Sequence, residues 1–184
     1  MNLSSTIQPR LSSTLRAVSV RVSRQIWAAP KPIFDAWLDA DEARTFLFAD
    51  WSGQAIRSEI DARVGGGFRL VRRSDGEDVE YLGQYLEIDR PHRLVFSLFV
   101  EKYAQRDDRV IVELAPVEAQ SLIVVTHEFS LRNLAEKSRI QRGWARVLDV
   151  LTARYPDGGV PRVPQRARVP VRCTMKFDPV RALD

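Results

Sequence analysis

The chain has 184 residues, of which 45% are hydrophobic and 28% are charged, the balance of an ordinary globular domain with a core of its own. No apolar run approaches the length that spans a bilayer, and the one cysteine, Cys173, excludes an internal disulfide and a multi-cysteine metal site. The formal net charge of +4 arises at the ends: residues 1–17 hold two arginines and no acid, and residues 156–184 hold six basic residues against three acids. It therefore does not indicate a nucleic-acid-binding domain.

The two ends of the chain are predicted to be irregular. Residues 1–17 are rich in Ser and Thr and lack acids, a composition that resembles a transit peptide but that we interpret as a disordered leader. Residues 156–184 hold five of the ten prolines and no helical period, which favours a flexible tail over an added edge strand from Val169 to Phe177. We therefore expect the folded domain to span residues 18–155, and the tail to be dispensable for folding.

The folded part is predicted to begin with a strand and two short helices. Alternating apolar residues predict a strand from Val18 to Trp27. Pro30 and Pro32 then open a short helix, because the first helical turn needs no backbone donor there. Asp39, with a glutamate three residues later, is typical of the cap of a second short helix that carries residues 46–48.

Three consecutive glycines, Gly65 to Gly67, stand between two strand-like segments at residues 55–60 and 68–72. A phosphate-binding loop would be followed by a helix, whereas the residues after these glycines alternate apolar and basic at strand spacing. The glycines are therefore interpreted as a corner between two strands, where the backbone needs positive φ.

Four further strands and one long helix complete the predicted elements. The strands are expected at residues 79–88, 94–101, 109–114 and 122–129, and their short turns make them an antiparallel meander. A helical period over residues 135–155 includes Trp144 in an apolar stripe that only the sheet can cover, and Gly143 is expected to let the helix approach the sheet closely. The predicted fold class is α+β, with about six to seven strands wrapped on the long C-terminal helix.

Several ordered motifs resemble one known family. They are IWAAPKPIFDAW from Ile26, EIDARVGGGF from Glu59, GQYLEIDRPHRLVF from Gly83, VVTHE from Val124, and Gly143-Trp144 with LDVL from Leu148. Together they resemble the bacterial proteins similar to the activator of heat-shock-protein-90 ATPase, in the START-like (SRPBCC) superfamily. The resemblance covers residues 18–155. It implies a helix-grip fold, in which a curved antiparallel sheet wraps on a long C-terminal helix with a cavity between them.

The candidate site residues lie on the inward face of the expected sheet. His127 shares a strand face with Val125 and is the candidate catalytic residue, although a core histidine bonded to backbone or to a tyrosine is the interpretation we favour. Tyr81 and Tyr85 share one face with Gly83 between them, where a glycine would leave space for a ligand. The candidate ligand-binding residues are Phe68, Leu70, Tyr81, Gly83, Tyr85, Phe96, Leu98, Val110, Val112, Val125, His127, Trp144 and Leu148.

Three functions are left open at this point. The leading one is the binding of a small apolar or aromatic molecule in the cavity, and the second is a cyclase, aromatase or dehydratase reaction with His127 and a tyrosine as acid–base pair. The third, implied only by the resemblance, is that of a chaperone partner acting through its surface. No metal is expected, because the two histidines lie far apart without a cluster of Cys or carboxylates. We expect no cofactor, nucleic acid or membrane, a cytoplasmic location, and leave a homodimer open.

Overall fold

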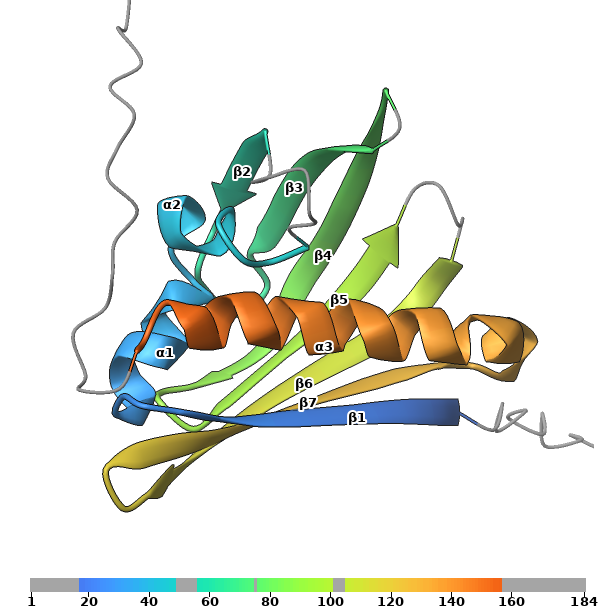
Figure 1. Cartoon of the computed structure of the whole chain (residues 1–184). Helices are drawn as coiled ribbons and strands as arrows, with labels where there is room; N and C mark the ends of the chain where they lie inside the picture. Colours follow the sequence, from blue (N-terminus) through green and yellow to red (C-terminus); the bar gives the residue numbers. More distant parts are fainter. Residues whose placement is uncertain (1–16, 49–55, 75, 101–104, 157–184) are drawn as a thin grey trace, which may run out of the picture.

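The computed structural model describes residues 17–48, 56–74, 76–100 and 105–156. Its seven strands are β1 (Ala17–Ile26), β2 (Arg57–Ile60), β3 (Gly67–Ser74), β4 (Glu77–Asp89), β5 (Arg93–Val100), β6 (Gln105–Val117) and β7 (Gln120–Ser130). They form one antiparallel sheet in the order β1-β7-β6-β5-β4-β3-β2. The helices are α1 (Pro30–Ala36), α2 (Ala40–Ala43) and α3 (Lys137–Ala153), and the 3-10 helix η2 (Leu131–Glu136) precedes α3. Figure 1 shows α3 lying across one face of the curved sheet, which confirms the predicted helix-grip fold.

The sequence signals at the start of the domain act as predicted, with one exception. Pro30 begins α1, and the side chain of Asp39 accepts 2.9 Å hydrogen bonds from the backbone N–H groups two and three residues later, at the start of α2. α2 ends at Ala43, however, so residues 46–48 lie beyond it and not on the helix. Phe48 adopts a left-handed φ of 56°, which a right-handed helix cannot include.

The three glycines form the predicted corner between β2 and β3. Gly65 has a φ of 81°, and a side chain at Gly66 would collide with the backbone of Asp61. β2 and β3 pair antiparallel, with Ile60 opposite Phe68. The segment is therefore a hairpin and not a phosphate loop.

The core lies between the sheet and α3. Alternate residues of β1, β6 and β7 point toward α3, as the pleat of a strand dictates. The helix contributes a buried stripe of Trp144, Val147, Leu148 and Leu151. Aromatic residues after α1 join this core: Trp37, which is 1% exposed, packs edge-on against Phe46 with ring centroids 5.4 Å apart and stacks on Trp144 at 6.3 Å.

The C-terminal end of α3 is tied to α1 and α2 by the two residues that follow it. Arg154 is buried, forms an ion pair with Glu42 and donates a 3.2 Å hydrogen bond to the backbone carbonyl of Glu42. Tyr155 donates a 3.3 Å hydrogen bond to the carbonyl of Pro32. Figure 1 shows this end of α3 beside α1. The two short helices thus lie beside the C-terminal end of α3, and the site described next lies along residues 139–147 of that helix.

The predicted leader and tail lie outside the described residues, apart from Ala17 and Pro156 at their inner ends. The alternating segment from Val169 to Phe177 also lies outside them, so its structure stays a prediction. No helix within the described ranges is long and apolar enough to cross a membrane.

Candidate functional site

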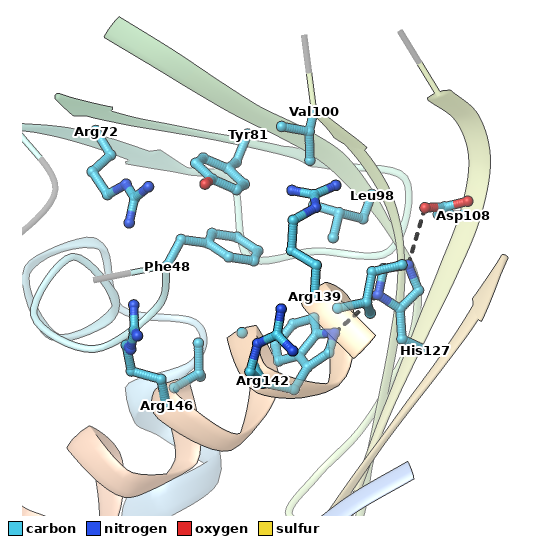
Figure 2. A pocket seen from close by; sticks show the side chains of 14 residues that line it. Phe48, Arg72, Tyr81, Leu98, Val100, Asp108, His127, Arg139, Arg142 and Arg146 are labelled. Atoms are coloured by element: carbon cyan, nitrogen blue, oxygen red, sulfur yellow. Dashed lines mark hydrogen bonds and ion pairs between the residues drawn. The ribbon is translucent and has the colours of Figure 1, made fainter. Parts of the chain in front are cut away.

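A hollow of about 350 Å³ lies between the sheet and residues 139–147 of α3. Its walls come from α3 and strands β3 to β7, together with Phe48 from the turns after α2 (Figure 2). This volume is at the lower end of the range for small-molecule sites. The lining residues are Phe48, Arg72, Tyr81, Leu98, Val100, Asp108, His127, Arg139, Ile140, Arg142, Gly143, Trp144, Arg146 and Val147.

Three hydrogen-bonded side chains form one wall of the hollow (Figure 2). The indole N–H of Trp144 donates to Nδ1 of His127 at 2.9 Å, and Nε2 of His127 lies 3.1 Å from Oδ2 of Asp108. Because Nδ1 accepts a hydrogen bond, we assign the ring proton to Nε2, which donates it to the Asp108 carboxylate. All three side chains are buried. Both ring nitrogens of His127 are therefore engaged with neighbouring side chains, and neither neighbour is the tyrosine or backbone group that the sequence suggested.

The strand register brings Asp108 and His127 together. His127 of β7 lies opposite Val110 of β6, and Asp108 precedes Val110 by two residues on the same face. The two residues are therefore diagonal neighbours, a separation that their side chains can span. Glu128 points to the other face, where its carboxylate lies 4.0 Å from the guanidinium of Arg109. The described residues hold no group of three or more His, Cys, Asp or Glu side chains that could bind a metal.

Three aromatic rings form a second wall. Phe48 stacks on Tyr81 with ring centroids 4.2 Å apart and planes 10° apart, and its centroid lies 5.6 Å from that of Trp144. The left-handed backbone of Phe48 costs a non-glycine residue about 1–3 kcal/mol. The two ring contacts offset part of that cost and hold the Phe48 ring in the wall.

Four arginines surround the hollow. Arg139, Arg142 and Arg146 come from α3, and Arg72 comes from β3 (Figure 2). Spacings of three and four residues place the three helix arginines on one face of α3. Asp108 is the one acid among the described lining residues, so four guanidinium groups stand against one carboxylate.

Gly143 leaves a gap in the α3 wall. No described heavy atom lies within 4 Å of the position that a Cβ would take there. The expectation that this glycine lets helix and sheet approach closely is therefore wrong. Its missing side chain instead adds open space to the hollow.

Four of the predicted ligand-binding residues line the hollow, namely Tyr81, Leu98, His127 and Trp144. The other nine lie outside the lining, because they pack against one another, against α3 and against the aromatic residues of α1 and the turns after α2. These nine are Phe68, Leu70, Gly83, Tyr85, Phe96, Val110, Val112, Val125 and Leu148.

The space expected at Gly83 is filled. Gly83 lies opposite Phe68 in the β3–β4 pairing, and a Cβ on Gly83 would overlap the Phe68 ring and the carbonyl oxygen of Ser97. Phe68 in turn packs edge-on against Phe96, with ring centroids 5.4 Å apart. The glycine thus serves close packing within the sheet, and the cavity expected there does not exist.

Tyr85 also belongs to the packed core. It is 3% exposed, and its hydroxyl donates a long, 3.5 Å hydrogen bond to the carbonyl of Trp37. Burial raises the pKa of the Tyr85 phenol well above its ordinary value, because the charged phenolate would lose its hydration. Of the two tyrosines expected to orient a ligand, Tyr81 alone lines the hollow.

The sequence patterns above do not single out Asp108, the arginines or Phe48. Asp108 continues the alternation of Val110 and Val112 one step back along β6, so extending that pattern would have found it. The arginines of α3 are visible as one face of the predicted helix. The place of Phe48 depends on a left-handed turn after α2, which no local pattern indicates.

The family described as "Activator of Hsp90 ATPase homolog 1-like protein" matches residues 28–155 of the chain. This range contains every residue that lines the hollow. No curated protein matches the chain.

Solved structures share the fold at low sequence identity. CalU16 from Micromonospora echinospora is 22% identical, with a TM-score of 0.57 over 73% of this chain and 74% of its own. CV1439 from Chromobacterium violaceum is also 22% identical, with a TM-score of 0.61 over 74% of this chain and 96% of its own. DynU16, described as a protein in the dynemicin biosynthetic locus, is 15% identical, with a TM-score of 0.62 over 77% of this chain and 48% of its own. At these identities the likeness shows the fold alone.

Proposed function

Since the chain belongs to the family of Activator of Hsp90 ATPase homolog 1-like proteins, we propose that it uses the helix-grip fold to bind a small apolar or aromatic molecule between its sheet and α3. One observation carries the proposal: the rings of Phe48, Tyr81 and Trp144 border an open hollow of about 350 Å³. Small-molecule sites combine hydrophobic and aromatic walls with a few polar groups. This hollow has such walls, although its four arginines, Asp108 and His127 make it more polar than usual. A flat ligand gains about 0.5–1.5 kcal/mol from each ring that it stacks on, beyond the burial of its surface.

The hydrogen-bonded wall favours binding because it holds its rings in place before a ligand arrives. Trp144 is held by His127 through the indole N–H, and His127 is held by Asp108. Groups that are ordered in advance lose little conformational entropy when a ligand binds.

The same hydrogen bonds weigh against an enzyme that uses His127 and a tyrosine as acid–base pair. A general base needs a lone pair that faces its substrate. In His127, Nδ1 accepts from Trp144 and Nε2 faces Asp108. Asp108 uses Oδ2 on His127, so an acid–base reaction in this hollow would have to use Asp108 or Tyr81 in place of the histidine.

The third alternative, a chaperone partner, rests on the family description alone. A partner that binds the outer surface would leave the aromatic wall without a role. The description of DynU16 as a protein of a biosynthetic locus is in line with a small organic ligand.

Blocking the hollow at Gly143 tests the proposal. N-phenyl-1-naphthylamine, a neutral aromatic probe that fluoresces in apolar surroundings, should bind the parent protein. Gly143→Phe should weaken that binding at least about tenfold, because the new ring enters open space in the hollow.

Gln141→Phe is the matched control, since it adds the same ring to α3 at an exposed position outside the lining. It should leave the affinity for the probe unchanged. Equal binding to the parent and to Gly143→Phe, or no binding to the parent, would refute the proposed site.

A further inference from the structure

Four guanidinium groups and one carboxylate line the hollow among the described residues. Three of these arginines have other interactions: Arg139 pairs with Glu136, and Arg72 and Arg146 also interact with other groups. That one carboxylate, Asp108, already accepts a hydrogen bond from His127. Arg142 is therefore the lining guanidinium that is left to attract an ion of the opposite sign, and the apolar walls beside it weaken the screening of its charge by water.

The acidic and basic side chains of α3 lie on different faces of the helix. Within Lys137–Ala153 the one acid, Asp149, lies away from the hollow, where its carboxylate accepts a 2.8 Å hydrogen bond from Arg24 of β1. Arg139 pairs with Glu136 of η2, which precedes the helix. Arg142 is exposed, lines the hollow and makes no ion pair with any residue in the described ranges. The basic face of α3 is therefore the face that borders the site.

We propose that the molecule bound in the hollow is an organic anion, with a flat apolar body and a carboxylate or phosphate group. This inference rests on the proposed function and narrows its ligand. The body would lie against Phe48 and Trp144, and the anionic group would meet the guanidinium of Arg142. Guanidinium groups suit this role, because they are always charged and present paired N–H donors that match the oxygens of a carboxylate or phosphate.

A solvated helix face is the simpler explanation of exposed arginines, and it makes a different prediction. Arginines that only solvate the surface would not distinguish a charged ligand from a neutral one of the same shape. Arginines that bind the ligand would give the charged ligand a higher affinity than the neutral one. Salt would reduce this difference in affinity, because the contacts are partly exposed.

The test compares an acid with its neutral ester. 2-Naphthoate and methyl 2-naphthoate have the same ring system, and each would be titrated against protein that carries N-phenyl-1-naphthylamine. 2-Naphthoate should displace the probe at a concentration at least about tenfold lower than the ester does, and this advantage should shrink at high salt. A third titration with 2-naphthyl phosphate tells which anionic group is preferred.

Arg142→Gln should remove most of the advantage of the acid and leave the affinity for the ester unchanged. Arg21→Gln is the matched control: it removes one positive charge from an exposed position of β1, outside the lining, and should retain the full advantage. Equal displacement by acid and ester, or an advantage that survives Arg142→Gln, would overturn the anion inference while binding of the neutral probe stands. Failure of the probe to bind the parent would instead overturn the proposed function.

Discussion

At the scale of single residues, His127 holds together two buried groups that would otherwise be unsatisfied. It accepts the indole N–H of Trp144 and faces the carboxylate of Asp108, and both neighbours are buried. A buried polar group that loses its partner costs about 1–3 kcal/mol, and a charged group costs more. We therefore expect His127→Leu to lower the free energy of unfolding by at least about 2 kcal/mol in urea titrations.

His127→Gln supplies the control for this prediction. A glutamine amide can accept from Trp144 with its oxygen and donate to Asp108 with its nitrogen, so it should recover part of the loss. If the leucine variant is as stable as the parent or the glutamine variant, the hydrogen bonds do not have this structural role.

Gly83 and Gly143 differ in their surroundings, since the first is closely packed and the second borders open space. A Cβ at Gly83 would overlap the Phe68 ring and the carbonyl oxygen of Ser97, whereas a Cβ at Gly143 would meet no described atom within 4 Å. Gly83→Ala should therefore destabilise the fold by about 1–3 kcal/mol through overpacking. Gly143→Ala should stabilise it by about 0.5–1 kcal/mol, because alanine loses less backbone entropy in a helix. Urea midpoints that move in the same direction for both variants would contradict this reading.

At the scale of elements, local sequence patterns predict the strands, α3 and the start of α2 correctly. Period-two alternation locates the strands, a helical stripe locates α3, and Asp39 marks the start of α2. The length of α2 was not predictable from these patterns, since it depends on the left-handed turn at Phe48.

The position of the hollow depends on contacts between elements that are far apart in the sequence, and local sequence patterns do not reveal these contacts. An inward strand residue can face either a packed core or an open space, and its face alone does not distinguish them. Gly83 and Tyr85 face the same layer as His127, but the Phe68 ring lies against both, and the Tyr85 hydroxyl reaches the backbone carbonyl of Trp37. The sequence therefore predicts the layer of the site and four of its lining residues, but not which part of α3 covers it.

At the scale of the whole molecule, buried tyrosine hydroxyls join the sheet, α1 and the end of α3. Tyr85 connects β4 to the end of α1 through the carbonyl of Trp37, and Tyr155 connects the end of α3 to the carbonyl of Pro32. Burial raises the pKa of both phenols above the ordinary value. The folded state therefore holds these protons more tightly than the unfolded chain does.

The sign of the resulting pH dependence follows from linkage. A group whose pKa is raised by folding contributes stability that is fully present below the ordinary phenol pKa of about 10 and is lost as the pH rises above it. The parent protein should thus be markedly less stable in urea at about pH 11 than at about pH 8. Tyr85→Phe cannot ionise, so its loss of stability between these two conditions should be smaller than that of the parent. If the stability of Tyr85→Phe falls as steeply between these pH values as that of the parent, ionisation of the Tyr85 phenol does not contribute to the loss of stability at alkaline pH.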